Sequence, residues 1–102
     1  MNIDQVVGAA VVLDNKNRKR WVATRTDFEP GESPDEHKVY YLYKDTFLLN
    51  IEYKWKEWND VDTPHAYLTK GGALRDGRRL QRLLERRVNK SRREYEKRIR
   101  LV

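Results

Sequence analysis

The last third of the chain, from Gly72 to Val102, constrains the fold most, because it predicts one long helix with two unlike faces. At about 100° per residue, eight mostly apolar or small residues fall within about a third of the helix circumference, the width of a core-facing stripe. These residues are Ala73, Gly77, Leu80, Leu84, Val88, Ser91, Tyr95 and Ile99. We expect this face to pack against the rest of the domain.

The opposite face carries seven cations at spacings of three or four, and no acidic residue interrupts them. This basic stripe consists of Arg79, Arg82, Arg86, Lys90, Arg93, Lys97 and Arg100. Like charges at these spacings cost a helix roughly 0.2–0.5 kcal/mol per pair, so helix stability alone would favour alternating signs. The stripe runs about 30 Å at 1.5 Å per residue, which is long enough to follow several phosphates. It therefore indicates an external anionic partner.

The composition predicts one folded domain over residues 1–102, since a chain of 102 residues can bury a single modest core. Charged residues make up 37%, but three Trp, six Tyr and two Phe supply large side chains for that core. Residues 71–102 contain 12 Lys and Arg against four Asp and Glu, a net charge of +8. The first 70 residues contain 10 against 12, a net charge of −2. The basic character therefore belongs to the helix.

The chain has no cysteine, which excludes disulfides, thiolate metal sites and a cysteine nucleophile. No apolar run approaches the length of a membrane span, and the first residues are too acidic and too short for a signal peptide. We therefore expect a cytoplasmic protein that requires no cofactor, no metal and no membrane.

Two hairpins are predicted before the helix. The run Val6 to Leu13 indicates a buried strand, and after a polar turn the β-prone segment Arg18 to Thr26 indicates its partner. Val39 to Lys44 and Thr46 to Trp58 predict a second hairpin, with its turn near Lys44-Asp45. Apolar and polar residues alternate along the last of these segments. Its apolar members are Phe47, Leu49, Ile51, Tyr53 and Trp55.

The predicted fold class is therefore α+β: an antiparallel four- to five-stranded sheet of two hairpins within residues 5–68, covered on one face by the long C-terminal helix, residues 72–100. We expect Leu80 to Val88 to pack on the apolar members of the alternating segment. Ala66-Tyr67-Leu68 predicts a short closing strand, and Thr69 a helix N-cap, with Asp76 as the competing cap.

A helix of this length exceeds the width of the sheet, so its last turns are expected to overhang. The apolar side chains of the overhang would find a partner if two copies of the chain form a homodimer, or if the end of the helix folds only on binding. The dimer contact would consist of Ser91, Tyr95, Ile99 and Leu101.

A second basic cluster, Lys19, Arg20 and Arg25, surrounds Trp21 in the first hairpin. Cations beside an aromatic ring can follow a nucleic-acid backbone or let an unpaired base stack on the ring. The alternative for Trp21 is a place in the core.

Pro34-Asp35 is followed, after sixteen intervening residues, by Glu52-Tyr53-Lys54 at the end of the apolar run Leu48 to Ile51. This spacing resembles the motif of the PD-(D/E)xK nucleases over about 20 of the 102 residues. The resemblance implies that Asp35 and Glu52 bind a divalent cation while Lys54 activates water or stabilises the transition state. The first 34 residues do not predict the helix that precedes the motif in that family. The simpler interpretation of Glu52 and Lys54 is an ion pair on the solvated side of the sheet.

Asp60, Asp62 and His65 lie within one loop and are of metal-ligand types, although residues of these types beside Pro64 are more typical of a turn. The sequence favours a small non-catalytic nucleic-acid-binding or regulatory protein, with DNA and RNA both open as partners. Two alternatives are an interaction module, an adaptor or inhibitor of a larger enzyme, that binds an acidic protein surface, and a metal-dependent nuclease.

Overall fold

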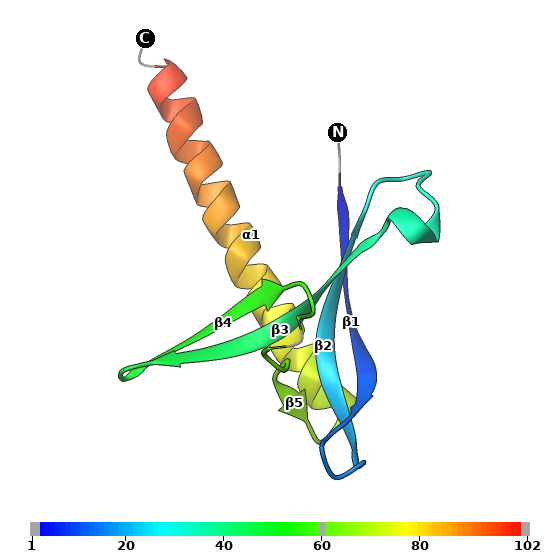
Figure 1. Cartoon of the computed structure of the whole chain (residues 1–102). Coiled ribbons are helices and arrows are strands. Elements are labelled where there is room, and N and C mark those ends of the chain that lie inside the picture. The colour runs from blue at the N-terminus through cyan, green and yellow to red at the C-terminus, as the bar shows by residue number, and fades with distance from the viewer. Residues whose placement is uncertain (1–2, 60, 101–102) are drawn as a thin grey trace.

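The computed structural model of the chain describes residues 3–59 and 61–100 (Figure 1). Its elements are β1 (Asp4–Leu13), β2 (Lys19–Phe28), the 3-10 turn η1 (Pro34–Glu36), β3 (Lys38–Phe47), β4 (Asn50–Lys56), β5 (Ala66–Tyr67) and α1 (Lys70–Arg100). The strands form one antiparallel sheet in the order β1-β2-β3-β4, and β5 pairs with β2. The predicted α+β class, with two hairpins and one long C-terminal helix, is confirmed.

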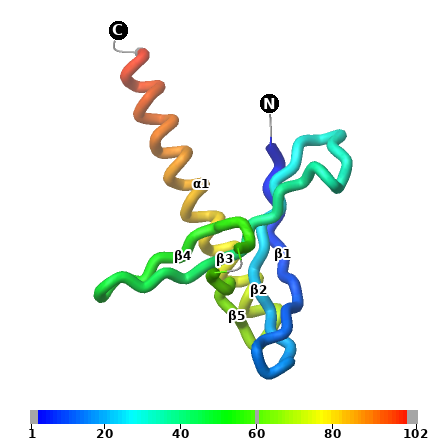
Figure 2. The backbone as a smooth tube through the Cα atoms, in the orientation of Figure 1, coloured from blue at the N-terminus to red at the C-terminus, as the bar shows by residue number. Residues whose placement is uncertain are grey.

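The two hairpins diverge from one another. β1 and β2 pair over their whole length, whereas β2 and β3 pair only from Thr24↔Tyr41 to Asp27↔Lys38. Figure 2 shows the β3–β4 hairpin leaving the body of the molecule in one direction and the free end of α1 leaving it in another. Two arms therefore project from a small centre.

The turn of the first hairpin follows from its polar residues. Asp14 Oδ1 accepts hydrogen bonds from the backbone N–H groups of Lys16 and Arg18, both at 2.9 Å. Asn17 has a φ of 58°, a left-handed conformation that asparagine tolerates better than most residues. The predicted hairpin is confirmed.

The turn of the second hairpin lies later than predicted. Lys44 and Asp45 are inside β3, where they pair with Tyr53 and Glu52, and the ladder continues to Phe47↔Asn50. The turn therefore consists of Leu48 and Leu49, with Leu48 at a φ of 55°. Polar residues usually mark turns, and here apolar residues occupy one, which is why the prediction was wrong.

The core is small and lies where α1 crosses the first hairpin. Among the described residues, the buried hydrophobic side chains are Val22, Ala23, Leu42, Tyr43 and Ala73. Gly77 brings the helix backbone close to the sheet, because a Cβ atom there would lie 3.0 Å from Val7 Cγ1 and 3.1 Å from Ala23 Cβ. The helix therefore packs mainly on β1 and β2.

The predicted packing of the helix on the alternating segment is largely wrong. Phe47 is 75% exposed, Leu49 is 100% exposed and Ile51 is exposed, because these residues lie out on the projecting arm. Among the apolar residues of the alternating segment, Trp55 packs against the core. On the helix, Val88, which was expected to be buried, is exposed. The predicted burial of the first strand is also wrong in part. Val6, Val11 and Leu13 are exposed, since β1 lies at the edge of the sheet.

The helix begins at Lys70, two residues before the predicted start. Thr69 Oγ1 accepts a 3.0 Å hydrogen bond from the backbone N–H of Gly72, which is the bond of an N-cap residue. Asp76 is not the cap, because it lies inside the helix and accepts a bond from the Tyr67 hydroxyl. The predicted cap at Thr69 is therefore confirmed.

The predicted overhang of the helix is also confirmed. All the side chains from Glu85 to Ile99, which we call the free half of α1, are exposed. Figure 1 shows this part of the helix extending away from the sheet to the C-terminal end. Within the described residues, no helix is long and apolar enough to cross a membrane.

Candidate nucleic-acid interface

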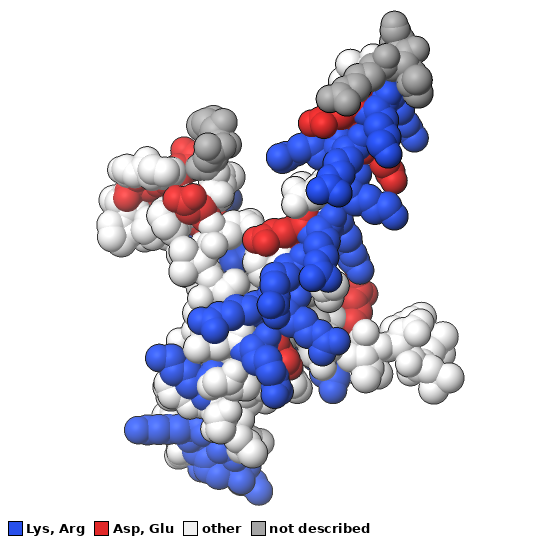
Figure 3. Space-filling view, turned by 180° about the vertical axis from the view of Figure 1, so that it is seen from behind, with Lys and Arg blue, Asp and Glu red and all other residues white. Residues whose placement is uncertain are grey.

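The helix geometry places the basic stripe on one continuous surface. Arg79 and Arg82 lie over the packed part of α1, and Arg86, Lys90, Arg93 and Lys97 follow on the free half. All six side chains are exposed. Arg100 is the last residue of α1, and its side chain is outside the described part of the chain. Figure 3 shows basic side chains along the length of the helix, from the sheet to the far end.

The described cations of the stripe are not paired with acidic side chains of the described residues. Among the described residues, no carboxylate forms an ion pair with any of the six; the ion pairs involve Asp14, Asp27, Asp45, Asp62 and Asp76. The acids of the free half, Glu85, Glu94 and Glu96, likewise form no ion pair with any side chain that the structure describes. An intramolecular partner that would neutralise the stripe is therefore missing from the described structure.

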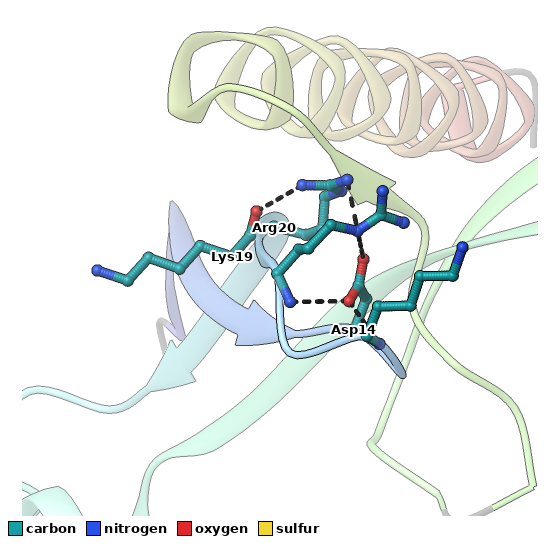
Figure 4. Close-up of polar contacts among 5 residues, drawn as sticks. Asp14, Lys19 and Arg20 are labelled. Carbon is teal, nitrogen blue, oxygen red and sulfur yellow. Dashed lines mark hydrogen bonds and ion pairs between the residues drawn. The ribbon is translucent and has the colours of Figure 1, made fainter.

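The turn of the first hairpin holds a second group of cations around one acid (Figure 4). Arg18 Nε lies 2.9 Å from Asp14 Oδ2, and Arg20 Nη2 lies 3.8 Å from the same atom. The backbone hydrogen bond from Arg18 is the largest cause that keeps the pKa of Asp14 below its ordinary value. Arg20 also donates a 2.9 Å bond to the carbonyl of Lys19, whose own side chain is exposed.

Arg25 lies inside the fold. Its guanidinium forms two hydrogen bonds to the carboxylate of Asp27, at 2.9 and 3.1 Å. The same group lies over the rings of Tyr40 and Trp55, with its central carbon 4.8 and 5.8 Å from their centroids. The side chain is only 14% exposed. Arg25 therefore joins β2 to β3 and β4 and adds little to the exposed basic surface.

Trp21 is half-buried and packs against the core cluster. The ammonium of Lys70, at the start of α1, lies 5.9 Å from its ring centroid. Of the two predicted places for this side chain, the structure gives the packed one. On the same hairpin the Lys19 side chain is exposed and the Arg20 side chain is 22% exposed. Figure 3 shows basic side chains at that end of the molecule, in the view that also shows the stripe.

The residues that resemble a nuclease motif lie on separate parts of the fold. Asp35 is in η1, whereas Glu52 and Lys54 are on β4, and Figure 1 shows these elements on opposite sides of the molecule. Lys54 Nζ lies 2.6 Å from Asp45 Oδ2, and this hydrogen bond is the largest cause that lowers the pKa of Asp45. The ion pair expected on this face therefore joins Lys54 to Asp45 rather than to Glu52.

Of the three loop residues considered as metal ligands, Asp62 and His65 are described, and each contacts other side chains. Asp60 lies outside the described residues, and Asp62 lies 3.9 Å from Lys56 Nζ. The His65 ring makes T-shaped contacts with the rings of Tyr67 and Tyr53, whose centroids are 4.8 and 6.2 Å away, and burial lowers the pKa of His65. Within the described residues, no group of three or more His, Cys, Asp or Glu could hold a metal ion.

A groove of about 450 Å³ between β4 and α1 was not predicted from the sequence. Its apolar lining consists of Ile51, Tyr53, Trp55, Leu80, Leu83 and Leu84. The alternation along β4 signalled an apolar face there. The sequence did not signal that the helix would pack on β1 and β2 and leave this face half covered.

No family model matches this chain, and no curated protein or solved structure matches it. The inferences about its function therefore rest on its own residues.

Proposed function

We propose that the protein binds a nucleic acid without catalysis, by docking the basic stripe of α1 on the sugar-phosphate backbone. The observation that supports the proposal is the combination of exposure and missing ion pairs for six cations on one helix face. A cation that has no internal carboxylate partner gains most from an external anion. Four of the six are arginines, whose planar guanidinium suits two-pronged contact with phosphate.

The proposed mechanism is counterion release. Each phosphate that the protein neutralises frees condensed cations, so the logarithm of the affinity falls by about 0.9 per contact for each tenfold rise in salt on duplex DNA. Six contacts predict a slope of about −5. Contacts to phosphate carry little sequence information, so binding should tolerate many sequences. Lys19 and Arg20 extend the proposed surface beyond the helix.

The experiment is a fluorescence-anisotropy titration of the full chain with a labelled duplex and a labelled single strand, each at several salt concentrations. The variant Arg82→Glu with Arg86→Glu and Arg93→Glu should keep the circular-dichroism spectrum and lose most of the affinity. Because all three residues are exposed, the reversal should not disturb the core. Equal affinity of the variant and the wild type would refute the proposal.

The same stripe suits an acidic protein surface, and one experiment separates the two partners. An affinity pull-down from the native cell is divided and one half is treated with nuclease. Partners that disappear after nuclease treatment support nucleic-acid binding, whereas one protein retained in both halves supports an adaptor or inhibitor. The side of the free half that faces away from the stripe is also exposed, and it is a candidate contact for a second copy of the chain.

A further inference from the structure

The free half of α1 exposes an apolar face as well as a basic one. Val88 is 56% exposed, Tyr95 is 65% exposed and Ile99 is 56% exposed, while Leu84 is half-buried at the edge of the groove against β4. These side chains continue, along the helix, the face that packs on the sheet between Ala73 and Gln81. An apolar helix face of this length, left without a partner in one chain, needs a specific cover.

The spacing of these residues fits a two-helix coiled coil. Leu84, Val88, Ser91 and Tyr95 recur at four, three and four residues, which are the d, a, d and a positions of a heptad. In the same frame the stripe residues of the free half occupy the outer c and f positions. A partner helix on the apolar face would therefore leave the basic stripe exposed.

The residues that flank the apolar face are self-complementary in charge. One flank carries Glu85 and Arg92 at e positions, and the other carries Arg87 and Glu94 at g positions. In an antiparallel pair, e positions meet e positions and g positions meet g positions. Glu85 then meets Arg92 of the second copy, Arg87 meets Glu94 of the second copy, and two-fold symmetry makes each contact twice. All four side chains are exposed and, within the described part of the chain, none forms an ion pair.

The charges on these flanks also disfavour other registers of the antiparallel pair and the parallel orientation. A slip of one heptad toward the C-terminus brings Arg92 against Arg92 and Glu94 against Glu94 of the second copy. A slip toward the N-terminus brings Glu85 against Glu85 and Arg87 against Arg87. A parallel pair brings Arg87 against Arg92. Interhelical charges of this kind set orientation and register.

We propose that two copies of this chain associate through antiparallel pairing of the free halves of α1, with Leu84 opposite Tyr95 of the second copy and Val88 opposite Ser91. In this register Ile99 of the second copy is level with Leu80 along the helix axis, on the opposite flank of the seam. Of the dimer contact expected from the sequence, Leu101 lies outside the described residues, and the pairing does not depend on it.

The pairing goes beyond the proposed function and does not rest on it, since no polyanion takes part in the contact. It has a consequence for that function, because the two basic stripes would lie on the outer faces of the paired helices. A dimer would thus offer two separate anion-binding surfaces, and it could bridge two nucleic-acid segments.

The first test is sedimentation equilibrium of the nuclease-treated full chain over a range of concentrations. The wild type should dimerise, and Arg92→Glu should raise the dimer dissociation constant about tenfold, because it sets like charges against each other twice. General charge repulsion predicts the opposite, since the substitution lowers the net charge of a chain that carries +6. The double variant Glu85→Arg with Arg92→Glu keeps the wild-type net charge and should restore dimerisation. A monomer at every concentration, or a dimer that Arg92→Glu leaves unchanged, would overturn the proposal.

The second test fixes orientation and register by cross-linking. The chain has no cysteine, so single cysteines can be introduced without competing thiols. Copies with Leu84→Cys mixed with copies with Tyr95→Cys should form a disulfide-linked dimer, whereas neither variant should do so alone. In the proposed register, equivalent positions are eleven residues apart along the axis, or about 16 Å, whereas a disulfide requires Cα atoms within about 7 Å. A disulfide in either variant alone, or none in the mixture, would overturn the antiparallel register.

Discussion

The hydroxyl of Tyr67 donates a 2.7 Å hydrogen bond to Asp76 Oδ2, which ties the two-residue strand β5 to α1. Both side chains are half-buried, and the bond crosses the short segment in which Thr69 caps the helix. The contact thus fixes the direction in which α1 leaves the sheet, and with it the direction of the basic stripe.

The variant Tyr67→Phe should lower the free energy of unfolding by about 1–2 kcal/mol, because it leaves a half-buried carboxylate without its donor. Burial is the largest cause that raises the pKa of Tyr67 above its ordinary value of 10.0. The neutral phenol therefore contributes stability that is complete below pH 10 and is lost as the pH rises further. Urea unfolding at pH 7 and at pH 11 measures both effects. If the variant loses as much stability between these two pH values as the wild type, the assignment to Tyr67 fails.

Because of His65, we expect the free energy of unfolding to decrease at acidic pH. Its pKa is lowered from 6.5, first by burial and then by the charge of Lys44, so the folded protein prefers the neutral ring. The unfolded chain then binds more protons, and the stability contribution of the neutral ring is present above pH 6.5 and is lost as the pH falls through the folded pKa. Urea unfolding between pH 7.5 and pH 5 should show the decline, and His65→Gln should flatten it. An unchanged slope in the variant would assign the decline to other groups.

Two glycines of α1 provide a matched test of the helix–sheet contact. A Cβ atom at Gly77 would meet Val7, Ala23 and Trp55 at 3.0–3.4 Å, whereas a Cβ atom at Gly71 would have no neighbour within 4 Å. Gly71→Ala should therefore stabilise the protein by roughly 0.5 kcal/mol through helix propensity. Gly77→Ala should destabilise it by about 1–2 kcal/mol, because overpacking outweighs the same gain. Thermal unfolding of the two variants measures the difference, and equal midpoints would exclude a tight crossing at Gly77.

Local periodicity predicted the elements better than it predicted their contacts. The helix and the hairpins follow from spacings of 3.6 and 2 residues and from the turn around Asp14, all of which are local. The surface on which the helix packs depends on tertiary structure. The small residues Gly77 and Ala23 permit a close crossing over the first hairpin, and the alternation along residues 46–58 does not indicate that crossing. The turn at Leu48-Leu49 was missed because neither residue has the usual chemistry of a turn.

The candidate site, like the fold, was predictable from the sequence only in part. The exposure of the stripe was predictable, since seven cations on one helix face cannot be buried together. The place of Arg25 was not predictable, because its partner Asp27 and the rings of Tyr40 and Trp55 come together only in the folded sheet. The groove between β4 and α1 likewise depends on the angle at which the helix crosses.

A comparison of two lysine pairs distinguishes the effect of the position of the charges on DNA binding from the effect of net charge. Lys90 and Lys97 lie on the stripe, whereas Lys38 and Lys44 are exposed on β3, away from the helix. Both pairs can be changed to glutamine with the same loss of two charges. Lys90→Gln with Lys97→Gln should make the salt slope of duplex-DNA binding shallower by about 2, because two phosphate contacts are lost. Lys38→Gln with Lys44→Gln should leave the slope unchanged within experimental error.

Since both lysines of the first pair lie on the outer side of the helix, neither change should alter self-association, so sedimentation provides an internal control. Equal effects of the two pairs on the slope would mean that binding follows total charge, and the helix face would then have no special part in it.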